Sequence, residues 1–325
     1  MDTRSLGAHG PSVSRIGLGC MFYGEVDEAQ VMQTLTSALD LGINHFDTAN
    51  VYEGGHSETL VGQALKSRRE EATIATKCGI VGRNTDGTLV LDTRPTAVRA
   101  ACDKSLSRLG VETIDLYYLH RFDPAIPIED TVGAMAQLVQ EGKVRHLGLS
   151  EVGAQTLERA YAVHPIAAVQ CEYSLWTRGV EDSILPACRT LGVAMVAYSP
   201  LGRGFLAGSV RDHGSLADRD LRHTVGDRFE AASIQANLDW LAQLEDMAKS
   251  KQVTVAQLAL AWLLAQGDDV FPIPGSRRLA HLQANAAACS VTLTAEDCAK
   301  IEMIVTPERV AGARYNDAML AQLGR

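Results

Sequence analysis

The sequence contains no long hydrophobic run. Its longest apolar stretch, residues 258–265, is far shorter than the roughly 20 residues that a helix needs to cross a bilayer. The first residues also lack the apolar segment of a secretion signal. We therefore expect a cytoplasmic protein without a membrane partner.

The chain has no excess of positive charge. Its 325 residues carry a formal net charge of −9, and its pI is about 5.5. Non-specific binding to nucleic acid or to an anionic membrane depends on clustered Lys and Arg, so this balance argues against both. Any phosphate site must be built locally from a few basic residues.

Three sequence patterns that would indicate other classes of site are also missing. The seven cysteines include no CxxC pair and no His at metal-ligand spacing, which indicates reduced thiols in the core and no bound metal. A GxGxxG fingerprint is absent as well, because residues 17–19 (Gly-Leu-Gly) are followed by Cys-Met-Phe. A Rossmann dinucleotide site is therefore excluded.

What the sequence does contain is a regular alternation of short β-branched runs and amphipathic helices. A hydrophobic fraction of 46% is ample for a large core, and 325 residues is an ordinary length for one α/β barrel. The alternation predicts parallel strands with right-handed crossovers. We expect the α/β class and a (β/α)8 TIM barrel in a single domain, residues 1–325. The expected strands are residues 16–19, 42–47, 73–77, 114–120, 144–149, 166–169, 193–197 and 269–273.

Other segments are expected to decorate this barrel. Residues 3–15 are polar and punctuated by Gly and Pro, which is typical of a hairpin that could plug the bottom of a barrel. Residues 78–91 are Gly-rich and polar, so we expect a long loop on the catalytic side that forms a wall of the substrate site. Residues 202–232 show no helical period and follow the seventh strand, which indicates a functional loop on the same face. Extra helices follow the last strand.

Polar residues stand at the ends of three successive expected strands. Asp47, Lys77 and His120 each close an apolar run, and Tyr52 follows five residues after Asp47. Singly, each has an ordinary structural explanation. Together they lie where barrel enzymes carry their chemistry, just past the C-terminal ends of the strands. A phenol has an ordinary pKa of about 10, so Tyr52 would need a cationic neighbour to act as an acid near neutrality.

These four residues, each in matching local sequence, resemble the catalytic tetrad of the aldo-keto reductase family. The similarity covers almost the whole chain, and its closest branch has Leu-His-Arg after the fourth strand and Gly-Leu-Ser-Glu after the fifth. Further motifs recur in order at barrel-like spacing. They are Ile16 to Gly19, Gly148 to Glu151, Tyr198 to Gly204 and Ile273 to Ser276.

The resemblance implies hydride transfer from NADPH to a carbonyl carbon, with NADH possible but weaker. Tyr52 would give the proton to the carbonyl oxygen as the general acid, and Lys77 would lower the pKa of Tyr52. Asp47 would hold Lys77 charged and in place. His120, as a neutral ring, would orient and polarise the carbonyl. No metal is required, and the partner is a small-molecule carbonyl substrate.

The resemblance also places the coenzyme. Ser150 and Gln170 would hold the nicotinamide carboxamide, and Tyr198 would stack on the nicotinamide ring. The positions for the pyrophosphate loop and for the segment around the adenosine 2′-phosphate fall on Ser199, Pro200, Leu201, Gly202, Arg203, Gly204, Ile273, Gly275, Ser276, Arg277, Arg278, His281 and Asn285. Two residues depart from the family pattern: Glu151 stands where an amide is frequent, and His281 where a permanent cation is common.

Three functions stay open at this stage. The first is NADPH-dependent reduction of aldehydes and some ketones to alcohols. The second is an NAD(P)-dependent dehydrogenase of a sugar lactol or a secondary alcohol. The third is a regulatory subunit that binds the coenzyme and a protein partner, as potassium-channel β subunits of this fold do. Substrate choice is expected to depend on residues 78–91, Phe22-Tyr23, Arg121-Phe122 and the C-terminal tail, where Arg314 and Tyr315 could pack by the barrel mouth.

Overall fold

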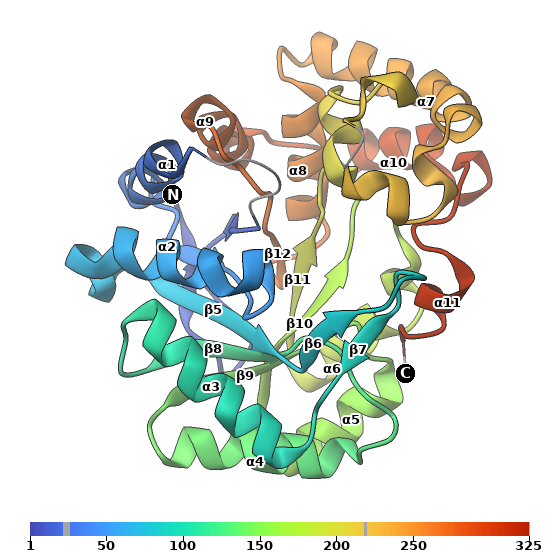
Figure 1. Ribbon diagram of the computed structural model, residues 1–325. Coiled ribbons are helices and arrows are strands. Elements are labelled where there is room, and N and C mark those ends of the chain that lie inside the picture. The colour runs from blue at the N-terminus through green and yellow to red at the C-terminus, as the bar shows by residue number, and fades with distance from the viewer. Residues whose placement is uncertain (22–26, 218–219, 325) are drawn as a thin grey trace.

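A sheet of eight parallel strands forms the centre of the protein (Figure 1). The computed structural model describes residues 1–21, 27–217 and 220–324. Every expected strand is present, which confirms the (β/α)8 fold. In the order of their hydrogen-bonded neighbours the strands are β12 (Val270–Pro272), β11 (Ala194–Tyr198), β10 (Ile166–Glu172), β9 (Val144–Ser150), β8 (Ile114–Leu119), β5 (Thr73–Cys78), β4 (His45–Asp47) and β3 (Leu18–Gly19).

The two outermost strands of this sheet meet and close the barrel. Gly19 forms a parallel bridge with Gly275, and its backbone N–H donates to the carbonyl of Pro274 at 3.2 Å. A Cβ atom at position 19 would lie 2.9 Å from the carbonyl oxygen of Ile273, so the closure needs glycine there.

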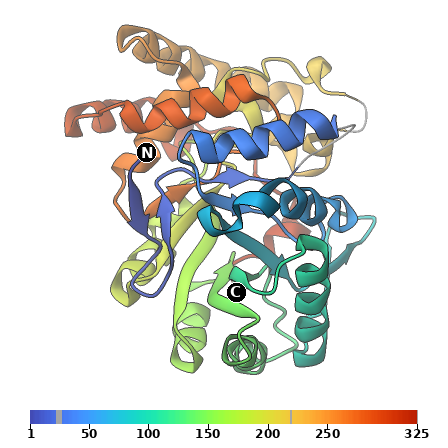
Figure 2. The ribbon, with the colours of Figure 1, turned by 90° about the vertical axis from the view of Figure 1, so that its left-hand side faces the viewer.

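The N-terminal hairpin plugs the bottom of the barrel, as the sequence predicts. Strands β1 (Thr3–Ser5) and β2 (Ser12–Ser14) pair antiparallel, and Figure 2 shows them in dark blue against one end of the sheet. Leu6 and Val13 are fully buried and belong to the same core cluster as inward residues of the barrel strands, such as Leu116. This end of the barrel is therefore closed by apolar side chains, and the open end is the opposite one.

In the described part of the chain, eight helices follow the eight strands and cover the outside of the sheet. Their boundaries agree with local signals: α8 begins with a Thr254–Gln257 capping box, and α3 ends at Gly110 in the left-handed conformation. No helix in the described ranges is long and apolar enough to cross a membrane. The barrel helices are α1 (Glu28–Asp40), α2 (His56–Leu65), α3 (Pro95–Leu109), α4 (Ile128–Gln140), α5 (Ala154–Val163), α6 (Ile184–Leu191), α8 (Val255–Ala265) and α9 (Leu279–Ala287).

The remaining helices are additions to the barrel. The region after β11 forms short 3-10 turns, in keeping with its lack of periodicity, and then the long helix α7. The additions are α7 (Ala231–Ser250), α10 (Ala295–Ile304), α11 (Asp317–Leu320), η1 (Tyr52–Gly55), η2 (Lys66–Glu71), η3 (Gly179–Glu181), η4 (Gly202–Ala207), η5 (His213–Ser215), η6 (Leu221–Thr224), η7 (Asp227–Phe229), η8 (Ala288–Ser290) and η9 (Pro307–Arg309).

The expectation of a long loop over residues 78–91 is wrong. These residues form an antiparallel hairpin of β6 (Ile80–Arg83) and β7 (Leu89–Leu91). Its turn is stabilised by Asp86, whose carboxylate accepts from the backbone N–H of Thr88 at 2.9 Å, and by Gly87 with a φ of 85°. An Asp-Gly pair between apolar residues is a hairpin signal, and the polar composition of the segment concealed it. Helix α11 lies beside this hairpin (Figure 1).

Candidate active site

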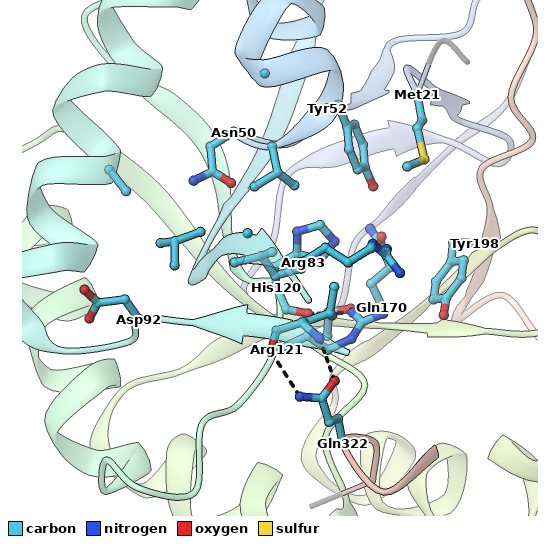
Figure 3. A pocket seen from close by; sticks show the side chains of 18 of the residues that line it. Met21, Asn50, Tyr52, Arg83, Asp92, His120, Arg121, Gln170, Tyr198 and Gln322 are labelled. Atoms are coloured by element: carbon cyan, nitrogen blue, oxygen red, sulfur yellow. Dashed lines mark hydrogen bonds between the residues drawn. The ribbon is translucent and has the colours of Figure 1, made fainter. Parts of the chain in front are cut away.

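A cavity of about 930 Å³ opens at the C-terminal ends of the barrel strands. Seven of the residues predicted from strand ends or from the resemblance line it, and five of these come each from a different strand or from the turn that follows one. Figure 3 shows four of these side chains, Tyr52, His120, Gln170 and Tyr198, around the same space. The five are Tyr52, His120, Ser150, Gln170 and Tyr198.

Lys77 and Asp47 lie beneath this cavity as a buried ion pair. Their side chains are 0% and 3% exposed, and the Lys77 ammonium donates to the Asp47 carboxylate. Lys77 Nζ also donates to the carbonyl of Thr48 at 2.7 Å, and Gln170 Nε2 donates to the second Asp47 oxygen at 2.7 Å. Burial lowers the pKa of Lys77, and the Asp47 charge opposes that effect. Each member of the ion pair is thus also held by a hydrogen bond to a neighbouring group, Lys77 by the Thr48 carbonyl and Asp47 by Gln170.

The net shift in the pKa of Tyr52 runs opposite to the one predicted from Lys77. Lys77 Nζ reaches the phenol oxygen at 3.5 Å, but its closer partners are Asp47 and a carbonyl. Burial, and after it the negative charge of Asp47, raises the pKa of Tyr52 above its ordinary value, and Arg121 is the cation that opposes them. Tyr52 is therefore a protonated phenol at neutral pH.

His120 is a neutral ring, as expected. Burial, followed by the charges of Arg121 and Lys77, holds its pKa well below the usual range. The ring stands edge-on to Tyr52 with centroids 5.9 Å apart. Its Nδ1 atom is buried and has no hydrogen-bond partner among the described residues. Tyr52 and His120, two members of the expected tetrad, thus face the same cavity above the buried ion pair.

Arg121 is a site residue that sequence reasoning placed only among the substrate determinants. It lines the cavity, and its Nη1 atom donates to the carbonyl of His120 at 2.6 Å and to Ser150 Oγ at 3.1 Å. Since Ser150 Oγ accepts this bond, the serine hydroxyl can donate its own proton elsewhere. The sequence does contain a signal for this role, because Arg121 is the last residue of the Leu-His-Arg motif that includes His120.

Glu151 faces the C-terminal tail. Its carboxylate accepts from Arg314 at 3.1 and 3.0 Å and from the Tyr198 hydroxyl at 2.8 Å. Arg314 and Arg121 lower the pKa of Glu151 against the effect of burial, which raises it. Tyr315 lines the cavity, and its hydroxyl lies 3.2 Å from that of Tyr198. The tail therefore packs by the barrel mouth, as the sequence indicated.

The segment predicted to cover the pyrophosphate contributes Ser199 and Arg203 to the cavity wall. Arg203 Nη2 donates to the Tyr315 hydroxyl at 2.9 Å. Gly202 and Gly204 have φ values of 55° and 99°, and a Cβ on Gly202 would lie 2.8 Å from the Trp176 ring. The glycines permit this tight turn. Pro200 and Leu201 are buried and half-buried behind it, outside the cavity lining.

The segment predicted to bind the adenosine 2′-phosphate lies outside the cavity lining, at the start of α9. Arg277, Arg278 and His281 are exposed there, and α9 packs beside α1. Exposed cations at a helix N-terminus suit an anionic group. The other predicted coenzyme-binding residues of this segment have structural contacts. Ile273 and Asn285 are buried, and Gly275 pairs with Gly19. Ser276 Oγ donates to the carbonyl of Arg278 at 2.9 Å.

The expected substrate determinants meet at the cavity rim with two exceptions. The hairpin contributes Ile80, Arg83 and Leu89, and the tail contributes Met319 and Gln322. Gln322 fastens the tail to the hairpin by accepting from and donating to the Leu89 backbone, at 2.9 and 3.1 Å. The exceptions are Phe122, which is buried outside the lining, and Phe22-Tyr23, which lies outside the described residues.

The sequence matches known proteins over nearly its whole length. A family model described as the aldo/keto reductase family matches residues 15–306. A relative from Glycine max, named "Probable aldo-keto reductase 1", is 44% identical over 320 residues, which are 97% of this chain and 92% of the relative.

Two solved structures extend the comparison to three dimensions. A glycerol dehydrogenase from Gluconobacter oxydans is similar with a TM-score of 0.83 and 32% identity, over 93% of this chain and 94% of that one. An aldo/keto reductase from Klebsiella pneumoniae, in complex with NADP and acetate, is similar with a TM-score of 0.75 and 28% identity, over 97% and 99%. Both similarities extend over nearly the full length of this chain.

Proposed function

The chain belongs to the aldo/keto reductase family, and on that premise we propose that it reduces aldehydes and some ketones with NADPH, with Tyr52 as the proton donor. The family makes it an NAD(P)H-dependent oxidoreductase. The observation that carries the proposal is the placement of Tyr52 and His120 on one wall of the cavity, directly above the buried Lys77–Asp47 pair.

The residues present fit a nicotinamide dinucleotide. The Ser150 hydroxyl and the Gln170 amide face the cavity as partners for the carboxamide, and the Tyr198 ring offers a flat wall for the nicotinamide. The glycine turn at residues 202–204 permits close approach of the pyrophosphate, and Arg277 and Arg278 would receive the 2′-phosphate. When bound, NADPH supplies the hydride that reduces the carbonyl carbon.

The chain's own side chains would handle the carbonyl oxygen. Tyr52 holds its proton at neutral pH because burial raises its pKa, and an oxygen that becomes an alkoxide is basic enough to take that proton. His120 would orient the carbonyl by a hydrogen bond from its neutral ring. Lys77, fixed by Asp47, would stabilise the phenolate that remains on Tyr52.

The test is turnover of a panel of aldehydes and ketones with the purified protein, followed by loss of the absorbance of NADPH. We expect reduction of several aldehydes, slower reduction of some ketones, and lower efficiency with NADH. Absence of turnover on every carbonyl, with coenzyme binding intact, would reject reduction and favour the regulatory subunit.

A second candidate is oxidation of an alcohol. It is favoured by the similarity to a structure described as a glycerol dehydrogenase, which covers 93% of this chain. The same protein should therefore be tested with NAD⁺ and NADP⁺ on polyols, secondary alcohols and sugar lactols. A higher kcat/KM for an alcohol than for the corresponding carbonyl, at the same pH, would favour the dehydrogenase.

A further inference from the structure

Arg121 is a buried cation at the floor of the cavity. The residue is 8% exposed, lies on the lining between His120 and Gln170, and follows strand β8 (Figure 3). Both of its hydrogen bonds use Nη1, one to the His120 carbonyl and one to Ser150 Oγ. Those bonds fix the guanidinium plane, and neither of them uses Nη2.

Within residues 1–21, 27–217 and 220–324, Arg121 has no carboxylate partner at ion-pairing distance, and its Nε is buried without a hydrogen-bond acceptor. Glu151 carries a charge that acts on Arg121, but its oxygens are already bound by Arg314 and Tyr198. A buried cation without a partner is costly, and a planar anion is the group that completes a guanidinium edge. An anionic ligand would therefore give Arg121 the direct ion pair that the described residues do not provide.

The rest of the rim adds further charged side chains. Arg83 on the hairpin is exposed, with its Nη1 bonded to the Gly87 carbonyl at 2.9 Å, and Lys104 on α3 is exposed on the same lining. The Asp92 carboxylate, which also lines the cavity, is held by Arg94. Glu53 is an exposed carboxylate on the same lining, so the rim carries both signs of charge, while the charged side chain at the floor is the cation Arg121.

We propose that Arg121 binds a carboxylate of the carbonyl substrate, so that the preferred substrates are aldehydes or ketones that carry an acid group. The inference rests on the proposed reductase function and narrows its substrate class. The nicotinamide carboxamide is the competing occupant of the same edge. An amide is neutral, however, and would leave Arg121 without a direct ion pair.

The test uses matched substrates that differ only in the acid group. Succinic semialdehyde and butanal are compared at 0.15 M salt, where the Debye length is about 8 Å and distant surface charges count for little. We expect a higher kcat/KM for the acid in the wild-type enzyme. Arg121→Gln should reduce the acid-to-neutral ratio of kcat/KM by about tenfold or more, as expected for loss of a charge-assisted hydrogen bond. Lys66→Gln, which removes an exposed cation outside the cavity lining, should leave the ratio almost unchanged.

Two results would overturn the assignment while the reductase function stands. One is a wild-type enzyme that reduces butanal as efficiently as succinic semialdehyde. The other is an equal loss on both substrates in Arg121→Gln together with weaker NADPH binding, which would place Arg121 at the coenzyme.

If the enzyme turns over no carbonyl, a binding measurement still tests whether Arg121 binds a carboxylate. Calorimetric titration of the enzyme–NADP⁺ complex with 4-hydroxybutyrate and with 1-butanol should show tighter binding of the carboxylate, and Arg121→Gln should remove the difference. Equal binding of the two alcohols to the wild-type complex would refute the carboxylate site.

Discussion

Glu151 and Arg314, 163 residues apart in the chain, form a two-point ion pair with N–O distances of 3.1 and 3.0 Å. The pair ties the tail to the residue directly after Ser150, and Tyr198 donates to the same carboxylate. The side chains expected to hold the nicotinamide are therefore coupled to the last segment of the chain.

Removing the Glu151 charge should loosen the tail. In Glu151→Gln the half-buried Arg314 loses its two-point anionic partner and keeps only the longer contact with Glu172 at 3.9 Å, so we expect a loss of about 2 kcal/mol of local stability. Trypsin should then cut after Arg314 faster than in the wild type, and NADPH should bind more weakly. Glu181→Gln is the matched control, because it breaks a two-point pair with Arg178 away from the cavity lining. Unchanged cleavage in Glu151→Gln would show that this pair does not hold the tail.

Tyr52→Phe should lower kcat by about 10² to 10⁴ with little change in NADPH affinity. The reason is that the ring keeps its edge-on contact with His120, at 5.9 Å, while the proton donor is lost. Steady-state kinetics and fluorescence titration measure the two quantities separately. A near wild-type kcat would remove Tyr52 from the role of acid.

The Asp47–Lys77 pair should show strong coupling in a double-mutant cycle. Each single variant, Asp47→Asn or Lys77→Met, leaves one buried charge without its counter-ion and should cost about 3 kcal/mol or more. The double variant should lose clearly less than the sum of the two. Urea denaturation gives the three values. The surface pair of Lys143 and Asp103 is the control and should show almost no coupling; additive losses at Asp47 and Lys77 would contradict the ion pair.

His45 should make the fold acid-sensitive. It is fully buried in β4, neither ring nitrogen has a partner among the described residues, and burial lowers its pKa to about 4. Since the unfolded chain keeps a pKa near 6.5, it binds the proton more readily than the fold between these values. Stability is therefore complete above pH 6.5 and falls as the pH drops toward 4, by about 3 kcal/mol.

The measurement is thermal unfolding between pH 7 and pH 4.5. His45→Gln should flatten this pH dependence, while the exposed His281→Gln should keep it. A slope equal to that of the wild type in His45→Gln would assign the acid sensitivity to other groups.

Arg277→Ala should reduce the preference for NADPH over NADH by about tenfold or more. The exposed residue precedes α9, and a charge-assisted hydrogen bond to phosphate is worth roughly 1.5–3 kcal/mol. The loss should fall on NADPH, with NADH binding almost unaltered, and Arg145→Ala, which lies outside this segment, should change neither. Parallel losses for both coenzymes would mean that Arg277 does not reach the 2′-phosphate.

Local patterns in the sequence were sufficient for the barrel and for the order of its elements. Apolar runs that end in Asp47 and Lys77 are strands in the structure, and α8 and α10 begin with capping boxes at Thr254 and Thr294. These features depend on side-chain periodicity and on hydrogen bonds within a few residues, so the sequence alone determines them. The missed hairpin at residues 80–91 was also local, and its Asp-Gly turn was overlooked.

The electrostatics of the site depend on contacts between distant segments, and only the tertiary structure decided them. Tyr52 next to a lysine suggests an acidified phenol, yet burial beneath several elements and the charge of Asp47 reverse the direction of the pKa shift. Glu151, which departs from the family pattern, accepts two hydrogen bonds from Arg314 near the end of the chain, a pairing that no local pattern indicates. Desolvation and charge pairing depend on how the tail, the hairpin and the strand ends come together around the cavity.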